Sequence, residues 1–557
     1  MSLDLSTRPW LASYGPGVPG RLDYPDITVA DLLRRAAQDH PEQDALDFLG
    51  ATTTYRGLAD EVERATAGLA ALGVEPGDRV AILLPNCPQH IVAFYAVLHL
   101  GAVVVEHNPL YTTAELEHPF ADHGAKVAVV WDKAAPVVQA LQPRTALEHV
   151  VSVDMTTALP LAKRLLLRLP VPAARRTRSD MTAKAPGTTS WSSLLGHGRA
   201  PAHEGGPGDT ALILYTSGTT GVPKGVPLTH RNLIANCVQG EAWVPGLVRG
   251  SERYLSALPM FHAYGITICV LFGVHMAATL VLLPKPEIDL VLDAFRRETP
   301  TFVPAVPPLY ARIVDTAAER GQSIRGVRNG LSGAMSLPPD LVDRWEEATG
   351  GLLSEGYGLT ECSPVIVGNP MTTERRPVPI GVPFPDVEIR IVDVDDPSRD
   401  VDEGESGELL VKGPQVFGGY RNAPEATAAA FQDGWFRTGD VVTISPDGYL
   451  TVVDRVKELI ITGGFNVYPS EVEEVLRSHP SVADCSVVGN ASDEGGERVA
   501  AVVVLAEGAE LDPDALRAHA RASLTAYKVP RAYLAVDELP TNIMGKVLRR
   551  EAAQLFG

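Results

Sequence analysis

Residues 215–226 form the segment whose residue types most clearly point to chemistry. They read Tyr-Thr-Ser-Gly-Thr-Thr-Gly-Val-Pro-Lys-Gly-Val, so hydroxyls and glycines surround one cation, Lys224. Glycines let backbone N–H groups approach an anion, hydroxyls add donors, and lysine adds a point charge. The apolar run 211–214 predicts a strand that ends at this segment. The pattern predicts a polyphosphate loop, with a flexible surface loop as the alternative. It is not a Walker A loop, because Gly225 follows the lysine where that motif has Ser or Thr.

A second segment, 355–361, reads Glu-Gly-Tyr-Gly-Leu-Thr-Glu. Glycines on both sides of Tyr357 leave its ring face open to a planar base, and Thr360 can donate to a phosphate. The carboxylate of Glu361 is the hard oxygen ligand that Mg²⁺ prefers. These residues predict a nucleotide and metal site. The alternative is a helix start with Thr360 and Glu361 exposed.

Three further residues are weak signals on their own. Asp440 follows Trp-Phe-Arg-Thr-Gly, and its carboxylate can accept both hydroxyls of a ribose, although Asp after Gly is more often a turn residue. Lys546, in Gly-Lys-Val-Leu-Arg-Arg, is equally typical of a basic surface turn. His262, in Pro-Met-Phe-His-Ala-Tyr-Gly, is equally typical of a structural histidine. Their meaning comes from occurring in one chain with the first two segments.

From about Thr54 to Arg550 the chain resembles the adenylate-forming superfamily, which includes acyl-CoA synthetases, luciferases and peptide-synthetase adenylation domains. The resemblance implies that Tyr357 packs on adenine, Thr360 meets the α-phosphate, and Asp440 with Arg455 holds the ribose. It also implies that Thr216 and Glu361 bind Mg²⁺. The implied catalytic residues are Lys546, Glu361, Thr216 and His262. The implied ATP/AMP site comprises Thr216, Ser217, Gly218, Thr219, Thr220, Gly221, Lys224, Gly333, Ala334, Glu355, Gly356, Tyr357, Gly358, Thr360, Asp440 and Arg455.

The resemblance also implies a division into two domains. Residues 1–455 bind AMP and the acyl group, and 456–557 form a mobile domain that carries Lys546 and pivots at Lys457. Gly464 is expected to line the CoA tunnel, because only a residue without a side chain leaves room for a passing ligand. An ordinary β-turn is the alternative there. The implied acyl pocket includes His262, Tyr264 and Ile266, and Ile266 stands where some long-chain synthetases have a gating Trp.

The implied activity is ATP-dependent activation of a carboxylic acid, with ATP, Mg²⁺ and coenzyme A. A carboxylate attacks the α-phosphate to give acyl-AMP, while Lys546 stabilises the transition state, and the CoA thiolate then displaces AMP. Segments 107–111, 355–364 and 463–469 favour bacterial synthetases for medium- or long-chain fatty acids. The alternatives are an aryl or short-chain carboxylate–CoA ligase, a fatty acyl-AMP ligase that loads a carrier protein, and a non-catalytic nucleotide-binding protein.

Composition limits the other possibilities. A chain of 557 residues is too long for one core, and a net charge of −20 argues against a nucleic-acid partner. The five cysteines have no metal or redox spacing, which is typical of a reducing cytoplasm, and the N-terminus has no signal-peptide pattern. Residues 266–283 favour a buried helix and strand over a membrane span. The oligomeric state, including a homodimer, stays open.

Alternating apolar runs and helical patterns predict an α/β fold. We expect a large N-terminal domain of βαβ subdomains with a small β-rich subdomain, followed by a small α+β C-terminal domain. The expected strands are 80–84, 103–105, 127–131, 387–394, 407–411, 487–488 and 499–505. The expected helices are 58–72, 89–100 and 513–523.

Residues 159–178 depart from the acidic character of the chain. They are rich in leucine and contain six basic residues, with no acid between Asp154 and Asp180. Such a segment is typical either of peripheral contact with an anionic membrane or of a packed surface helix or mobile loop. If the segment contacts a membrane, we expect a cytoplasmic protein that is peripherally attached to the inner face of the membrane. The basic residues are Lys163, Arg164, Arg168, Arg175, Arg176 and Arg178.

Overall fold

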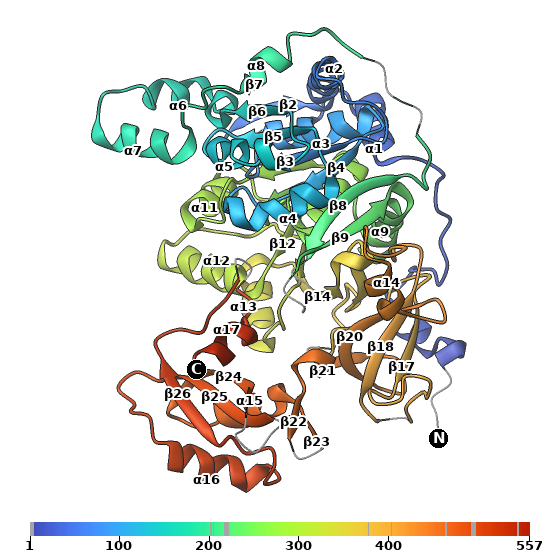
Figure 1. Ribbon diagram of the computed structural model, residues 1–557, viewed down its shortest axis with the longest axis vertical. Helices are drawn as coiled ribbons and strands as arrows, with labels where there is room; N and C mark the ends of the chain where they lie inside the picture. The colour runs from blue at the N-terminus through green and yellow to red at the C-terminus, as the bar shows by residue number, and fades with distance from the viewer. Residues whose placement is uncertain are drawn as a thin grey trace. The chain divides into compact units, whose positions relative to one another are not determined.

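The computed structural model describes residues 5–200, 203, 205–216, 222–376, 378–402, 404–462, 465–491, 497–542 and 545–556 (Figure 1). The chain forms two compact units. Unit 1 comprises Met1–Ala12, Ile389–Val411 and Arg437–Gly557, and unit 2 comprises Ser13–Glu388 and Lys412–Phe436.

A seven-stranded sheet in unit 2 has the order β7-β6-β5-β3-β4-β8-β9. Its neighbouring strands are parallel, except that β8 and β9 are antiparallel. Parallel strands are buried on both faces, which explains the continuous apolar runs that predicted β3, β4 and β5 correctly. The strands are β3 Arg79–Leu83, β4 Val103–Glu106, β5 Val127–Trp131, β6 His149–Val153, β7 Thr189–Ser190, β8 Thr210–Thr216 and β9 Lys224–Thr229.

The second sheet of unit 2 has nine strands in the order β16-β15-β14-β13-β12-β10-β11-β1-β2. Its centre is parallel, and antiparallel pairs close both edges. The strands are β1 Asp44–Phe48, β2 Ala51–Thr54, β10 Arg253–Ser256, β11 Thr279–Leu282, β12 Phe302–Ala305, β13 Asn329–Ser332, β14 Leu352–Gly358, β15 Val365–Gly368 and β16 Val382–Pro383.

Helices flank both sheets, and α11, α12 and α13 lie side by side (Figure 1). The helices predicted at 58–72 and 89–100 are confirmed as α2 and α3. The side chain of Thr54 caps α2 by accepting from the Gly57 N–H group, and α3 begins with Pro88. The longer helices are α1 Val29–Asp39, α2 Tyr55–Ala71, α3 Pro88–His99, α4 Thr113–His123, α9 His230–Trp243, α11 Ile288–Arg297, α12 Pro307–Glu319 and α13 Pro339–Thr349. The shorter ones are α5 Ala135–Gln139, α8 Trp191–Leu194 and α14 Pro424–Ala430.

Residues 266–283 are a buried helix and strand, as predicted. A π-helix, η5 (Gly265–Leu271), continues into α10 (Phe272–His275), and β11 follows inside the nine-stranded sheet. Across the described ranges, none of the helices combines the length and the apolar character that crossing a bilayer requires.

The predicted β-rich region is a five-stranded sheet with the order β17-β18-β20-β19, in which β21 also pairs with β20. It confirms the strands expected at 387–394 and 407–411. The pairs β19–β20 and β20–β21 are antiparallel. The strands are β17 Glu388–Val392, β18 Gly407–Lys412, β19 Phe431–Gln432, β20 Trp435–Ile444 and β21 Leu450–Arg455.

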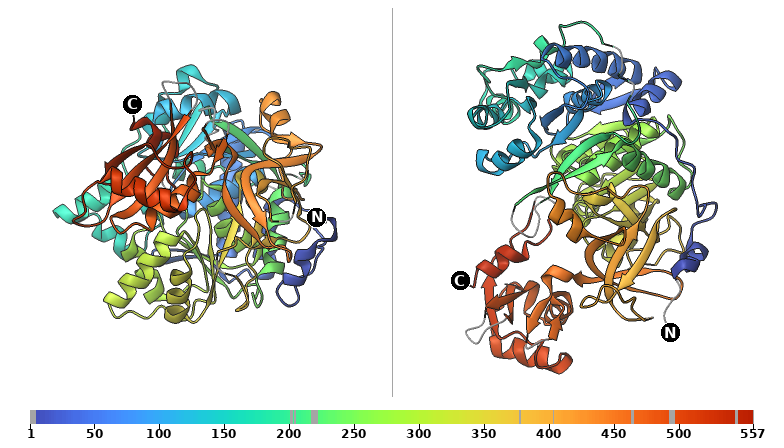
Figure 2. Two further views of the ribbon diagram at one scale, coloured as in Figure 1. Left: turned by 90° about the horizontal axis from the view of Figure 1, so that it is seen from below. Right: turned by 45° about the vertical axis from the view of Figure 1, so that its right-hand side comes forward.

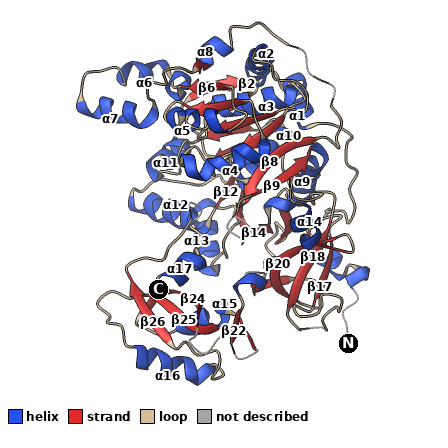
Figure 3. Ribbon diagram, viewed as in Figure 1, coloured by secondary structure: helices blue, strands red, loops and turns tan. Residues whose placement is uncertain are grey.

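The C-terminal part of unit 1 has an α+β fold, with helices packed on both faces of the sheet β24-β25-β26 (Figure 3). Helices α15 and α16 pack on one face of this sheet, and α17 packs on the other. The predicted strands and the helix 513–523 are confirmed, although β24 is much longer than 487–488. The elements are β22 Ile460–Thr462, β23 Phe465–Val467, α15 Pro469–Arg477, β24 Val482–Ala491, β25 Glu497–Leu505, α16 Pro513–Ser523, β26 Ala532–Val536 and α17 Arg549–Gln554.

The leucine-rich basic segment forms two short helices, α6 (Leu161–Leu166) and α7 (Pro172–Met181), that project from unit 2 (Figures 1 and 2). Neither helix contains a buried residue. The segment is therefore helical and lies on the surface, held by contacts such as the hydrogen bond from Lys163 to the Leu49 carbonyl. The leucines of α6 face solvent because no neighbouring element covers them: Leu161 is 69% exposed, Leu165 54% and Leu166 58%.

Candidate active site

The predicted polyphosphate loop lies between two antiparallel strands, β8 and β9. Thr216 ends β8 and lies opposite Lys224, the first residue of β9, so the predicted strand end is confirmed. Both residues are half-buried. The remaining predicted loop residues lie outside the described ranges, namely Ser217, Gly218, Thr219, Thr220 and Gly221. The two ends of the loop are therefore held in one register by the sheet.

Tyr420 connects Lys224 with Glu361. Its hydroxyl donates to Glu361 Oε1 at 2.8 Å, and its ring centroid lies 5.1 Å from Lys224 Nζ, which is a cation–π distance. The Phe417 N–H group donates to the Glu361 carbonyl at 2.8 Å. Burial, and then the charge of Glu361, raises the pKa of Tyr420, so the phenol stays a donor. Sequence reasoning missed Tyr420, whose only signal was its place after Gly418-Gly419.

The segment 355–361 is the end of strand β14 followed by one 3₁₀ turn, η6 (Thr360–Cys362). The expected alternative of an exposed helix start is wrong, because Glu361 is only 9% exposed and Thr360 is half-buried. A Cβ at Gly358 would lie 1.8 Å from the Pro364 carbonyl oxygen, and one at Gly356 would lie 3.2 Å from Leu331. Packing therefore requires glycine at Gly358, independently of any ligand.

Glu355 is a buried carboxyl group at the start of this segment. It lies opposite Ser332 across β13 and β14, and the Leu337 N–H group donates to it at 3.4 Å. Burial raises its pKa to about 8. Glu355 is thus largely protonated at neutral pH and can donate a hydrogen bond. Tyr357, two residues on, is half-buried.

Three of the predicted segments meet at Gly333. A Cβ there would lie 3.1 Å from the ring of Tyr264 and 3.3 Å from the Gly356 carbonyl oxygen. The next residue, Ala334, is exposed and has a positive φ of 68°. Gly333 and Gly356, which the resemblance assigns to the ATP/AMP site, are therefore neighbours of Tyr264, which it assigns to the acyl pocket.

His262, Tyr264 and Ile266 lie on one short stretch. His262 Nδ1 accepts from the Tyr264 N–H group at 3.2 Å, and burial lowers the pKa of His262, which keeps it neutral near pH 7. The Tyr264 hydroxyl donates to the Leu331 carbonyl. Ile266 is fully buried in the π-helix. A neutral His262 can act as a hydrogen-bonding group but not as a cation.

Asn86 fixes the backbone that leads into this stretch, and sequence reasoning missed it. Its side-chain NH₂ group donates to the carbonyls of Ser256 at 3.0 Å and Leu258 at 2.8 Å. Its Oδ1 accepts from the Met260 N–H group at 3.1 Å. Asn86 is buried, so these three bonds satisfy a side chain that water does not reach.

Unit 1 contains the predicted ribose-binding pair. Asp440 and Arg455 lie opposite each other on β20 and β21, and Arg455 Nε contacts Asp440 Oδ1 at 2.9 Å. Asp440 is buried inside a strand, so the turn alternative for this residue is wrong. The resemblance implied that Arg455 acts together with Asp440, and the two side chains form an ion pair.

Lys546 lies on a tight turn near this pair. The Lys546 N–H group donates to Asn542 Oδ1 at 3.0 Å, and the Lys546 carbonyl accepts from the Asn542 N–H group at 2.9 Å. Burial, and then the charge of Arg455, lowers the pKa of Lys546 to about 8, while Glu458 and Asp440 act in the opposite direction. The charges of the turn and of the ribose-binding pair therefore interact.

Two predicted residues, Lys457 of the expected hinge and Gly464 of the expected CoA tunnel, carry less structural information. Lys457 is exposed in the short turn η7 (Val456–Glu458). Gly464 lies outside the described residues. The hinge and the CoA tunnel are therefore predictions that the described geometry does not test.

Comparisons with known proteins agree along the chain. Residues 33–421 match the AMP-binding enzyme family, and 471–546 match the AMP-binding enzyme C-terminal domain. A long-chain-fatty-acid–CoA ligase of Bacillus subtilis is 35% identical over 98% of this chain and 97% of its own. A feruloyl-CoA synthase of an Amycolatopsis species is 37% identical over 94% of this chain and 98% of its own.

A solved structure agrees as well. ATP-bound MatB from Rhodopseudomonas palustris is 29% identical, with a TM-score of 0.79, over 95% of this chain and all of its own. The matches therefore cover both the AMP-binding enzyme region and its C-terminal domain. The same chain contains the packing at Gly358 and the Asp440–Arg455 pair described above. This protein belongs to the AMP-binding enzymes.

Proposed function

We propose that this protein is an AMP-forming acid–thiol ligase that converts a medium- or long-chain fatty acid to acyl-AMP and then to acyl-CoA. The observation that carries the proposal is the similarity to a long-chain-fatty-acid–CoA ligase along nearly the whole of both chains. Within unit 2, Thr216 and Lys224 at the ends of the glycine-rich loop suit phosphate oxygens, and within unit 1 the pair Asp440 and Arg455 suits a ribose.

In the first step the carboxylate attacks the α-phosphate of ATP, and pyrophosphate leaves. Lys546 neutralises charge that develops on the α-phosphate, while Lys224 and the hydroxyl of Thr360 contact phosphate oxygens. Tyr357 stacks on adenine against the wall formed by Gly333 and Ala334. The carboxylate of Asp440 accepts the ribose hydroxyls, with Arg455 holding its other oxygen.

The residues suit Mg²⁺ binding through few protein ligands. Among the described residues, no group of three or more His, Cys, Asp and Glu side chains is placed to hold a metal ion. Mg²⁺ typically keeps several waters and takes one or two protein oxygens plus phosphate oxygens. Glu361, with its second oxygen fixed by Tyr420, and Thr216 are the residues that would hold it. Mg²⁺ would supply charge neutralisation of the phosphates.

The second step transfers the acyl group to the thiolate of coenzyme A and releases AMP. We assign the nucleotide and acyl sites to residues 1–455 and the mobile part to 456–557, with Lys457 as the hinge. Gly464 lines the tunnel through which the thiol arrives. His262, Tyr264 and Ile266 border the acyl chain, and His262 lies near the carboxylate.

An aryl–CoA ligase is the second candidate, because the feruloyl-CoA synthase is slightly more identical over a shorter stretch. Both candidates use the same chemistry, so only the acid distinguishes them. The test is AMP release from ATP and Mg²⁺ with acids from acetate to oleate and with ferulate, with and without CoA. CoA-dependent turnover that favours long acyl chains supports the proposal. A preference for ferulate supports the second candidate, and pyrophosphate release without acyl-CoA indicates an acyl-AMP ligase.

We propose further that the hairpin of α6 and α7 contacts an anionic membrane. Its exposed leucines supply apolar area, and its six basic residues are attracted to anionic headgroups, whereas the whole chain carries −20. Flotation with phosphatidylglycerol vesicles tests this. Replacing Leu161, Leu165 and Leu166 by serine should abolish binding, and Arg164→Gln with Arg168→Gln should weaken it.

The control for this test is the pair Arg320→Gln and Arg344→Gln, which removes the same charge from half-exposed positions elsewhere in unit 2. Equal loss of binding in both double arginine variants would indicate that only net charge matters. Wild-type protein that stays with the unbound fraction would refute the contact.

A further inference from the structure

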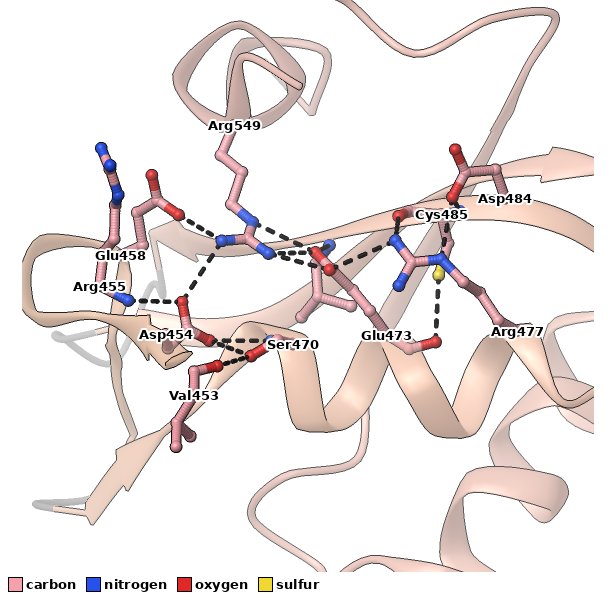
Figure 4. A network of polar contacts seen from close by, with 11 residues as sticks. Val453, Asp454, Arg455, Glu458, Ser470, Glu473, Arg477, Asp484, Cys485 and Arg549 are labelled. Carbon is pink, nitrogen blue, oxygen red and sulfur yellow. Dashed lines mark hydrogen bonds and ion pairs between the residues drawn. The ribbon is translucent and has the colours of Figure 1, made fainter. Parts of the chain in front are cut away.

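Arg549 lies three residues after Lys546 and points into a group of three carboxylates (Figure 4). Its Nη2 contacts both oxygens of Glu473, at 2.8 and 2.9 Å, and its Nε contacts Oε1 of Glu473 at 3.2 Å. Its Nη1 contacts Asp454 at 3.4 Å and also pairs with Glu458. One guanidinium therefore joins α15 to the segment 454–458.

Two of the three carboxylates around Arg549, Asp454 and Glu473, are buried, whereas the side chain of Glu458 is 28% exposed. The side chain of Asp454 is 1% exposed and that of Glu473 is 6% exposed, so both need a cationic partner. Asp454 also accepts from the Ser470 N–H group at 2.9 Å and its hydroxyl at 2.7 Å, and from the Arg455 N–H group at 2.8 Å (Figure 4). These bonds fix Asp454 as an anchor for Arg549.

Lys546 and Arg549 lie on one short stretch of chain whose described residues are hydrogen-bonded to each other. The turn that carries Lys546 is closed by reciprocal bonds with Asn542 and, at its base, by the Leu548 N–H group, which donates to the Pro540 carbonyl at 2.8 Å. Arg549 directly follows this base. Only two residues of the chain therefore separate the anchor at Arg549 from Lys546.

Segment 454–458, which contacts Arg549, also contains Arg455 of the predicted ribose-binding pair. Arg455 lies between Asp454 and Glu458 in the chain and pairs with Asp440. Arg549 thus contacts Asp454 and Glu458 of segment 454–458. Arg455 of the same segment pairs with Asp440. These contacts connect the base of the Lys546 turn to the predicted ribose site.

We propose that Arg549 is a positioning residue for adenylation, which anchors the Lys546 turn to segment 454–458 and so sets Lys546 against the Asp440–Arg455 pair. The assignment rests on the proposed function, because it presumes that Lys546 acts on the α-phosphate. Arginine suits this role, since its planar fork binds one carboxylate through two bonds and still has donors for two others. Lysine offers a single ammonium point.

The test separates the two half-reactions. The variants are Arg549→Gln and Arg549→Lys, with Arg477→Gln as the matched control. Arg477 also contacts Glu473, at 3.4 Å, but it pairs with Asp484 and donates to the Cys485 carbonyl rather than contacting segment 454–458. Single-turnover pyrophosphate release measures acyl-AMP formation, and AMP release from supplied oleoyl-AMP with CoA measures thioester formation.

Arg549→Gln should slow acyl-AMP formation by roughly tenfold to 10²-fold, the scale of a misplacement of about 1 Å, with KM values for ATP and acid little changed. Thioester formation from oleoyl-AMP should stay within about twofold of wild type. Arg549→Lys should recover part of the loss, and Arg477→Gln should leave acyl-AMP formation unchanged. Asp454→Asn, which keeps the shape but removes the charge, should reproduce the selective loss if Arg549→Gln does not fold.

Equal slowing of both half-reactions in the Arg549 variants would mean a purely structural role and would overturn the proposal. So would unchanged acyl-AMP formation in folded Arg549→Gln, or a selective loss in Arg477→Gln. A wild-type protein that forms no acyl-AMP from any acid refutes the proposed function instead, which keeps the two failures distinguishable.

Discussion

The hydroxyl group of Tyr420 donates a 2.8 Å hydrogen bond to Oε1 of Glu361, a residue 59 positions earlier in the chain. The ring of the same tyrosine lies 5.1 Å from Nζ of Lys224. One side chain therefore orients the carboxylate proposed for Mg²⁺ and lies beside the cation proposed for the phosphates. Tyr420 thereby links segments 215–226 and 355–361, the two segments that the sequence predicts to bind the nucleotide and the metal.

Tyr420→Phe should raise the Mg²⁺ concentration that supports half-maximal MgATP binding by about three- to tenfold. The reason is the loss of one hydrogen bond to a charged group, worth about 1 kcal/mol or somewhat more. Equilibrium titration of ATP binding at stepped Mg²⁺ measures this without turnover. Tyr111→Phe, at an exposed tyrosine of the same unit, is the control. An unchanged Mg²⁺ requirement in Tyr420→Phe would show that the hydrogen bond does not orient Glu361.

The lowered pKa of Lys546 predicts a basic limb in the adenylation step. Burial and Arg455 bring this pKa to about 8, so the stabilising charge is present below that pH and is lost as the pH rises through it. kcat/KM for ATP, which reports groups of the free enzyme, should fall above about pH 8. Lys546→Arg should be slower but should lack this limb, because guanidinium stays charged. A limb that persists in Lys546→Arg would assign it to another group.

Asn86→Asp should impair use of the acid more than use of ATP. A carboxylate oxygen would replace the NH₂ group that faces the carbonyls of Ser256 and Leu258, so like charges would displace the backbone before His262. A cost of 1–3 kcal/mol corresponds to a rise in KM for the acid of roughly five- to a hundredfold. Steady-state kinetics with each substrate varied separately measures the difference. Equal rises in both KM values would contradict the assignment.

The buried pair His107 and His123 should make unit 2 sensitive to acid. Their Nε2 atoms are 3.2 Å apart, burial lowers the pKa of His107 to about 3, and burial with nearby cations lowers that of His123. Both remain neutral when folded but bind protons below about pH 6.5 when unfolded. The contribution of this pair to stability is therefore greatest above pH 6.5 and falls as the pH drops, by up to about 1.4 kcal/mol per pH unit for each group.

The measurement is the thermal midpoint of unfolding between pH 8 and 5, values chosen to span the usual histidine range of about 6.5. His107→Gln should flatten the pH dependence, whereas His118→Gln, at an exposed histidine, should not. Parallel pH dependence in wild type and His107→Gln would show that this pair does not control acid stability.

Much of the fold follows from the sequence because buried strands are continuous apolar runs. β3, β4 and β5 were predicted in this way, and helices α2 and α3 follow from their apolar periodicity. β14 was harder, because Gly356 and Gly358 lower strand propensity, and the strand exists through pairing with β13 and β15. The leucines of 159–178 could not be placed from the sequence, because Leu159 is buried whereas Leu161, Leu165 and Leu166 of the same segment are exposed.

The site was predictable where its residues cluster in the sequence. The pairing of Asp440 with Arg455 followed from the resemblance, since both lie in recognisable motifs. Asn86 and Tyr420 had no comparable signal, because their partners lie far away: the carbonyls that Asn86 holds are 170 and 172 residues distant. Such contacts depend on tertiary packing, which local patterns do not encode.

The antiparallel pairing of Thr216 with Lys224 has an electrostatic consequence. Many phosphate loops lead straight into a helix, whose N-terminal macrodipole helps to hold the anion. Here β9 comes between, and α9 begins only at His230. No helix dipole follows β9's side of this loop directly, so the charge of Lys224 carries more of the attraction, and we expect the affinity for polyphosphate to weaken with ionic strength.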